Sequence, residues 1–260
     1  MRLRKTNLDD LPQLKALWAL GFGDTEQEIE AFFAISYPVA TGFCAEEDGA
    51  VIAMLFALPL TLAHGEEMQK AAYLYAVATD EAFRGRGVCR ALMEFAERTL
   101  RKRYVSCLLL VPETEKLASY YETMGYARQD SCTMQTLRAD APQGAAAVVT
   151  PQEYAGLRET LLFDVPHTRY SKAQLDYAAE DLDFYRLEQG YALGCAAVRR
   201  AGQIVEELLP DARMLPALAA ALGTGQYPVK TPGHGTMNCM AKWLDAEKQT
   251  APIWLAFDFD

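Results

Sequence analysis

The stretch FRGRGVCRAL, residues 83–92, combines glycines and arginines in a pattern that could bind phosphate. Glycines let a ligand approach the backbone closely, and arginine side chains raise the local positive potential. Two common phosphate-binding motifs do not fit. Arg90 stands where a G-x-G-x-x-G dinucleotide loop has its third glycine, and the sequence contains no G-x-x-x-x-G-K-[ST] run. The stretch therefore predicts an anion cradle of another kind.

Regular elements are predicted on both sides of this stretch. The apolar run YLYAVAT, residues 73–79, predicts a strand, and apolar residues at helical spacing after Gly87 predict a long amphipathic helix. A helix N-terminus offers unpaired N–H groups and the positive end of the helix dipole. The dipole stabilises an anion by about 0.3–2 kcal/mol. This geometry suits a pyrophosphate.

A second stretch, LLLVPETEKLASYYETMGYAR over residues 108–128, predicts a central strand and then a helix that ends at Gly125. With the first stretch it resembles GNAT-type N-acetyltransferases. Their cofactor loop reads Q/R-x-x-G-x-G/A after the fourth strand, and a later helix reads A-x-x-x-Y-x-x-x-G-F. Tyr121 falls at the tyrosine position, and Gly125-Tyr126 replaces Gly-Phe. The resemblance in order and spacing covers residues 43–137.

The resemblance implies that acetyl-CoA is the co-substrate and that no metal is needed. The implied cofactor contacts are Val77, Thr79, Arg84, Gly85, Arg86, Gly87, Val88, Cys89 and Thr114. Two of these depart from the family pattern: Cys89 replaces Gly or Ala, and Thr114 stands where many members have Asn. Val77 and Thr79 are implied by their place on the fourth strand, where backbone groups pair with the pantetheine arm.

By the same resemblance the reaction is acetyl transfer to an amine. A phenol with a pKa near 10 is suited to protonate a departing thiolate, whose acid has a pKa near 8.5. Tyr121 is the predicted general acid, and packing of its helix onto the sheet is the alternative role. Glu46 is the predicted general base. Other candidates remain open: Glu47, Tyr73, Tyr75, Asp80 and a chain of water molecules.

The predicted fold class is α/β (α+β), with a mixed GNAT-like sheet, splayed central parallel strands and flanking helices. Strands 74–79 and 105–111 are the expected splayed pair, and residues 132–139 are the strand expected to close the first half. Residues 1–139 are the predicted acetyl-CoA-binding domain, 140–147 a linker, and 148–260 a second, smaller GNAT-like domain. Helices and strands of the second half are expected in a similar order.

The second half has no arginine–glycine cradle. The sequence after its third predicted strand is PDARMLPALAAALG, residues 210–223, so a degenerate domain without a cofactor site is expected. Residues 254–260 are predicted as a last strand. Some multidomain relatives bring a C-terminal carboxylate to the active site, and the acidic ending FDFD leaves that role open.

Composition limits the remaining possibilities. The formal net charge of −10 argues against a nucleic-acid partner and favours a cationic small molecule or peptide amine. No apolar run is long enough to cross a membrane, and the N-terminus lacks a signal-peptide core, so a cytoplasmic protein is expected. A monomer or homodimer is expected. The six scattered cysteines form no metal-ligand pattern.

The sequence therefore leaves two functions to be distinguished. The leading prediction is an acetyl-CoA-dependent N-acetyltransferase that acts on a primary amine. The alternative is a non-catalytic acyl-CoA-binding sensor or scaffold, which the departures at Cys89 and Thr114 would allow.

Overall fold

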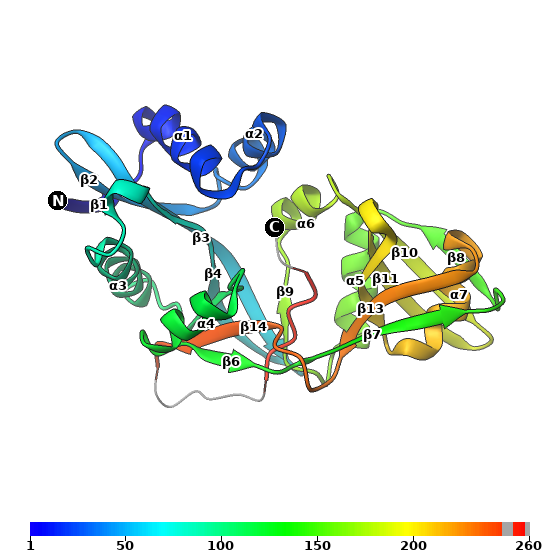
Figure 1. Cartoon of the computed structure of the whole chain (residues 1–260). Helices are drawn as coiled ribbons and strands as arrows, with labels where there is room; N and C mark the ends of the chain where they lie inside the picture. Colours follow the sequence, from blue (N-terminus) through cyan, green and yellow to red (C-terminus); the bar gives the residue numbers. More distant parts are fainter. Residues whose placement is uncertain (246–251, 258–260) are drawn as a thin grey trace. The chain divides into compact units, whose positions relative to one another are not determined.

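The computed structural model describes residues 1–245 and 252–257 and contains two β-sheets with helices packed on them (Figure 1). The chain forms two compact units. The first consists of Met1–Leu60, Gln69–Ala127 and residues 241–245. The second consists of Thr61–Met68, Arg128–Met240 and residues 252–257. Each unit therefore contains a segment from the other half of the sequence, whereas we expected two consecutive domains.

The first half of the chain forms the elements β1 (Arg2–Lys5), α1 (Leu11–Phe22), α2 (Glu26–Ile35), β2 (Thr41–Glu47), β3 (Ala50–His64), β4 (Glu67–Thr79), α3 (Val88–Arg101), β5 (Cys107–Leu110), α4 (Glu115–Glu122) and β6 (Ala127–Gln129). In the first sheet the strand order is β1-β2-β3-β4-β5-β14-β6, with β9 paired to β3. Helices α1 and α2 lie on one face of β3 and β4, and α3 and α4 lie on the other (Figure 1).

Local sequence signals explain several of these elements. Thr25 and Glu28 form a capping box at the start of α2, as their spacing predicts. Large aromatic side chains from α1, α2 and the sheet then fill the space between them: the ring centroid of Trp18 lies 4.6 Å from that of Phe32 and 5.4 Å from that of Tyr75. This packing fixes α1 and α2 against β4.

Residues 132–139 do not close the first sheet. They form β7 (Cys132–Ala139), which is an edge of the second sheet and pairs antiparallel with β13. The place beside β5 is taken instead by β14 (Cys239–Trp243), which lies between β5 and β6. The expectation for 132–139 is therefore wrong, because a strand far along the chain supplies the neighbour that β5 needs.

The remaining elements are β8 (Ala145–Val148), α5 (Pro151–Leu161), β9 (His167–Arg169), α6 (Lys172–Ala178), β10 (Leu182–Gln189), β11 (Ala192–Arg199), β12 (Ile204–Leu209), α7 (Leu215–Leu222) and β13 (Gly225–Pro232). The second sheet has the order β7-β13-β12-β11-β10-β8. Strand β8 begins inside the segment expected to be a linker. The last strand expected at 254–260 does not form over the described residues 254–257, where Trp254 makes an isolated bridge with His167. Residues 258–260 of the FDFD ending lie outside the described residues.

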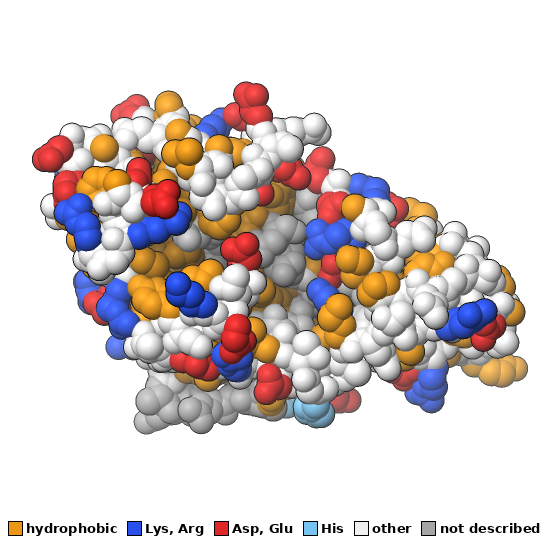
Figure 2. Space-filling model, in the orientation of Figure 1, with side chains coloured by type: hydrophobic (Ala, Val, Ile, Leu, Met, Phe, Trp, Pro, Cys, Tyr) orange, Lys and Arg blue, Asp and Glu red, His pale blue; other side chains and the backbone are white. Residues whose placement is uncertain are grey.

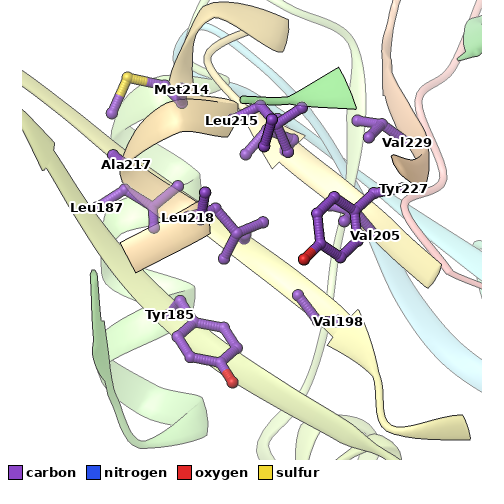
Figure 3. Packing of buried hydrophobic residues seen from close by; sticks show 14 residues of the cluster. Tyr185, Leu187, Val198, Val205, Met214, Leu215, Ala217, Leu218, Tyr227 and Val229 are labelled. Carbon is purple, nitrogen blue, oxygen red and sulfur yellow. The ribbon is translucent and has the colours of Figure 1, made fainter. Parts of the chain in front are cut away.

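The core of the second unit lies between its sheet and α7. Figure 3 shows Leu215 and Leu218 of α7 pointing toward side chains from β10 to β13, among them Leu187, Val205 and Val229. These side chains are at most 3% exposed. The unit therefore has a hydrophobic core of its own.

Candidate active site

The predicted anion cradle is a turn of exposed backbone at the start of α3. Gly85 and Gly87 have φ angles of +75° and +77°, a region that side chains rarely adopt, so glycine is required there. A Cβ atom added at either glycine would meet nothing within 4 Å, which means that the space above the turn is open. Gly87 is the N-cap of α3, and no side chain caps this end. The first N–H groups of the helix are therefore available to an anion.

The side chains of Arg84 and Arg86 contact groups next to the turn. Arg84 donates from Nε to the backbone oxygen of Thr79 at 3.1 Å. Arg86 pairs with Glu47, with 3.2 Å between Nη2 and Oε1, and its guanidinium lies 4.9 Å from the ring centroid of Phe83. Both side chains remain exposed. They add positive charge to the cradle, while the backbone provides its shape.

Strands β4 and β5 run parallel, and their pairing stops before β4 ends. Their register pairs Ala71 with Cys107 and ends at Tyr73 with Leu109, whereas β4 continues to Thr79. The parallel pairing and the early end of the ladder agree with the predicted splayed pair. Ala76 has a φ of +48°, a conformation that costs about 1–2 kcal/mol for a residue with a Cβ. The strained backbone precedes half-buried Val77 and lies beyond the end of the ladder.

Tyr121 on α4 is 7% exposed, and its ring meets the ring of Tyr126 edge-on with 5.9 Å between centroids. Burial raises the pKa of the Tyr121 phenol well above its usual value of 10. Within residues 1–245 and 252–257 its hydroxyl has no hydrogen-bond partner, and it is not sealed from solvent. The phenol is thus held protonated and free to donate a hydrogen bond.

Comparison with known proteins agrees with this geometry. The family model of the GNAT acetyltransferase domain matches residues 2–128. The chain carries a GNAT acetyltransferase domain. The match includes the cradle, the splayed strands and Tyr121. Among curated proteins, none has a significant sequence match to the chain.

Solved structures share the fold across both units. A conserved protein from Enterococcus faecalis V583, described as a probable N-acyltransferase, has 16% identity and a TM-score of 0.75, covering 94% of this chain and 72% of its own. GCN5-related N-acetyltransferases from Kribbella flavida and Anabaena variabilis ATCC 29413 have 17% and 14% identity and TM-scores of 0.72 and 0.71. Each covers 94% of this chain, and the matches span 72% and 73% of their own chains. The predicted mixed α/β fold class is confirmed.

Glu46 of the GNAT domain is held in an ion-pair network. Its Oε2 lies 2.7 Å from Nε of Arg4, and the same guanidinium makes two hydrogen bonds to Asp10. These contacts tie β2 to β1 and to the turn before α1. The carboxylate is therefore already engaged by a cation, and its role as general base stays a prediction.

The other open candidates for the base also have structural contacts. Asp80 accepts a hydrogen bond from the backbone N–H of Ala82 and so caps the turn after β4. Glu47 holds Arg86. Tyr73 and Tyr75 are buried and stack on each other, with 6.1 Å between ring centroids. Each therefore has a part in holding the fold.

The two departures from the GNAT pattern are both accommodated. Cys89 lies in the first turn of α3, where burial raises the pKa of its thiol and where its Sγ donates to Sδ of Met93 at 3.9 Å. Thr114 caps α4, since its Oγ1 accepts a hydrogen bond from the N–H of Leu117 at 3.2 Å. Asn is also a good N-cap, so Thr114 can replace it at the start of this helix.

Sequence reasoning missed three side chains of this region. Arg90 and Tyr120 connect α3 with α4, and Lys242 of β14 contacts Glu97 of α3 and Tyr126 just after α4. Arg90 was visible only as the residue that breaks the dinucleotide motif. Nothing in the sequence near Lys242 indicates that it belongs to the first sheet.

In the part of the chain that the structure describes, we looked for a metal site, disulfides, a membrane-spanning helix and a basic surface. Those residues contain no cluster of three or more His, Cys, Asp or Glu side chains placed to hold a metal ion, and the six cysteines form no disulfides. No helix among them is long and apolar enough to span a bilayer. On the face shown in Figure 2, basic and acidic side chains are interspersed, with no extended basic area.

Proposed function

We propose that the protein transfers the acetyl group of acetyl-CoA to a primary amine. The observation that carries the proposal is the presence, within one GNAT acetyltransferase domain, of an open backbone cradle at Gly85–Gly87 and a buried phenol at Tyr121. The early end of the β4–β5 ladder supports it, because β4 continues to Thr79 beyond its last pair with β5.

In this proposal the pyrophosphate of acetyl-CoA binds at the N-terminus of α3, where Val88 and Cys89 offer backbone N–H groups. Arg84 and Arg86 add positive charge around it. The pantetheine arm follows β4 past Thr79 toward Val77, in the place where β5 no longer pairs with that strand. Thr114 lies at the start of the helix that carries Tyr121.

Chemistry then follows from the groups at the splayed strands. The neutral amine attacks the thioester carbonyl, and the N–H of Val77 stabilises the oxyanion of the tetrahedral intermediate. The carbon–sulfur bond breaks, and Tyr121 gives its proton to the departing thiolate. The attacking nitrogen loses its proton to water, because Glu46 is held by Arg4. Proton return from solvent restores the phenol.

The acceptor is proposed to be cationic. The Cβ position of Gly21 in α1 lies 3.4 Å from Cβ of Ala78, which brings the end of α1 against β4 two residues beyond Ala76. The turn that follows carries Asp24, and the first turn of α2 carries Glu26 and Glu28. Carboxylates at this edge favour the approach of an ammonium group.

The second unit is proposed to be a degenerate relative of the first that binds no cofactor. Its β12 and β13 are parallel, as β4 and β5 are in the first sheet. The turn after β12 contains no glycine, and Asp211 accepts the N–H of Arg213 there. A carboxylate at this place would repel a pyrophosphate.

The test is to measure release of free CoA from acetyl-CoA in the presence of a panel of primary amines. We expect sustained release with at least one cationic amine and identification of the acetylated amine by mass spectrometry. If acetyl-CoA raises the melting temperature but no amine is turned over, the sensor alternative is supported. If acetyl-CoA neither binds nor is turned over, both functions are excluded.

A further inference from the structure

Tyr121 depends on its surroundings for its orientation. It lies on α4, a helix of eight residues, and such a short helix is marginal by itself. Among the described residues its hydroxyl makes no hydrogen bond that could fix it. What holds α4 therefore determines where the Tyr121 phenol points.

Arg90, from the first turn of α3, binds the end of α4. Its Nη2 donates to Oγ1 of Thr123 at 2.6 Å, and its Nη1 donates to the backbone oxygen of Thr123 at 3.3 Å. Thr123 is the C-cap of α4, where a cation also interacts favourably with the helix dipole. The guanidinium lies 5.9 Å from the ring centroid of Tyr120.

Lys242, from β14, holds the segment directly after α4. Its Nζ donates to Oε2 of Glu97 on α3 at 2.6 Å and lies 5.8 Å from the ring centroid of Tyr126. Its Cε lies 3.5 Å from where a Cβ on Gly125 would be. Tyr126 in turn contacts Tyr121 edge-on. A continuous series of contacts thus runs from Glu97 through Lys242 and Tyr126 to the phenol.

We infer that Arg90 and Lys242 are positioning residues for Tyr121. The inference rests on the proposed function, because it gives these side chains their role through the general acid. It also assigns a catalytic purpose to the late strand β14, which brings Lys242 into the acetyltransferase sheet from 121 positions beyond Tyr121.

The deciding experiment is a double-mutant cycle of Lys242→Met with Tyr121→Phe, using the best amine from the panel. Met keeps the apolar stem over Tyr126 and removes the charge. We expect Lys242→Met to lower kcat about 10- to 100-fold, because small displacements of a reacting group have effects of this size. The KM for acetyl-CoA should change little, and Lys242→Arg should retain most of the activity. In the Tyr121→Phe background Lys242→Met should add almost nothing.

Two controls separate positioning from folding. Lys116→Met removes an exposed cation from α4 and should leave kcat unchanged. Hydrogen exchange should show faster exchange of the α4 amides in Lys242→Met, with the melting temperature close to that of the wild type.

The contrary results separate a failure of the inference from a failure of the proposed function. Full kcat in Lys242→Met, unchanged exchange of α4, or independent effects of the two substitutions would overturn the inference and leave the proposed function intact. A wild-type rate in Tyr121→Phe alone would remove Tyr121 as the acid, and the inference would be lost with it.

Discussion

At the scale of single residues, the chemistry of Tyr121 depends on its burial. A phenol with an ordinary pKa would begin to ionise near pH 10, whereas burial beside Tyr126 raises the pKa of Tyr121 further. The neutral form, which can donate a proton, is therefore retained across the range in which amines become deprotonated. The same burial therefore packs the ring and keeps the phenol in its neutral form.

This leads to a prediction for the pH dependence of the reaction. We expect kcat/KM for the amine to rise with pH as the acceptor loses its proton, and to show no decline below about pH 10, because Tyr121 remains protonated. Steady-state rates between about pH 6 and 10 measure this profile. A basic limb with an apparent pKa below about 9 would contradict the assignment of Tyr121.

The identity of a residue and its place on a strand do not show whether it is available as the general base. Glu46 was predicted from its place on the second strand, but its partner Arg4 is 42 positions away and Asp10 completes the network. A sequence read locally cannot show that a carboxylate is already paired with a distant cation. The catalytic role of Tyr121 stays a prediction, and it rests on a motif that lies within ten residues.

At the scale of elements, the cradle is formed by the backbone, and the glycines in the sequence predict its geometry. The positive φ at Gly87 and the uncapped start of α3 follow from the local pattern R-G-R-G-V, and so this part of the site could be predicted. The strain at Ala76 could not, because nothing in an apolar strand indicates that one alanine takes a positive φ.

Gly87→Glu is predicted to weaken acetyl-CoA binding at least about 100-fold, because a carboxylate would face the pyrophosphate and like charges placed together cost several kcal/mol. Calorimetric titration measures the change. The matched control is Gly49→Glu in the β2–β3 turn, where φ is +82° and a Cβ also meets nothing within 4 Å. Both variants carry similar backbone strain, so equal affinities in the two would exclude the cradle as the binding site.

At the scale of the whole molecule, each unit contains a strand that the sequence order assigns to the other half. Strand β14 separates β5 from β6 in the first sheet, and β7 forms an edge of the second. Strand-forming patterns for 132–139 were correct, but the partner of a strand is a long-range choice between similar edges. Local periodicity therefore predicted the strand at 132–139 but assigned it to the wrong sheet, and it did not predict β14.

A fragment of residues 1–139 is predicted to be insoluble or inactive, because it lacks β14 and leaves an unpaired edge at β5. Coexpression with residues 140–260 should restore soluble protein and CoA release, whereas coexpression with residues 140–238, which lack β14, should not. A soluble, fully active 1–139 fragment would show that β14 is dispensable.

The central claim is that Tyr121 serves acetyl transfer from acetyl-CoA to an amine. The most direct test is the kcat of Tyr121→Phe, measured as CoA release and acetylated amine, together with its affinity for acetyl-CoA. Removal of a general acid costs about 10²- to 10⁴-fold in rate. The account predicts a loss of that size with acetyl-CoA still bound at wild-type affinity. An unchanged kcat in a fully folded Tyr121→Phe protein would contradict it.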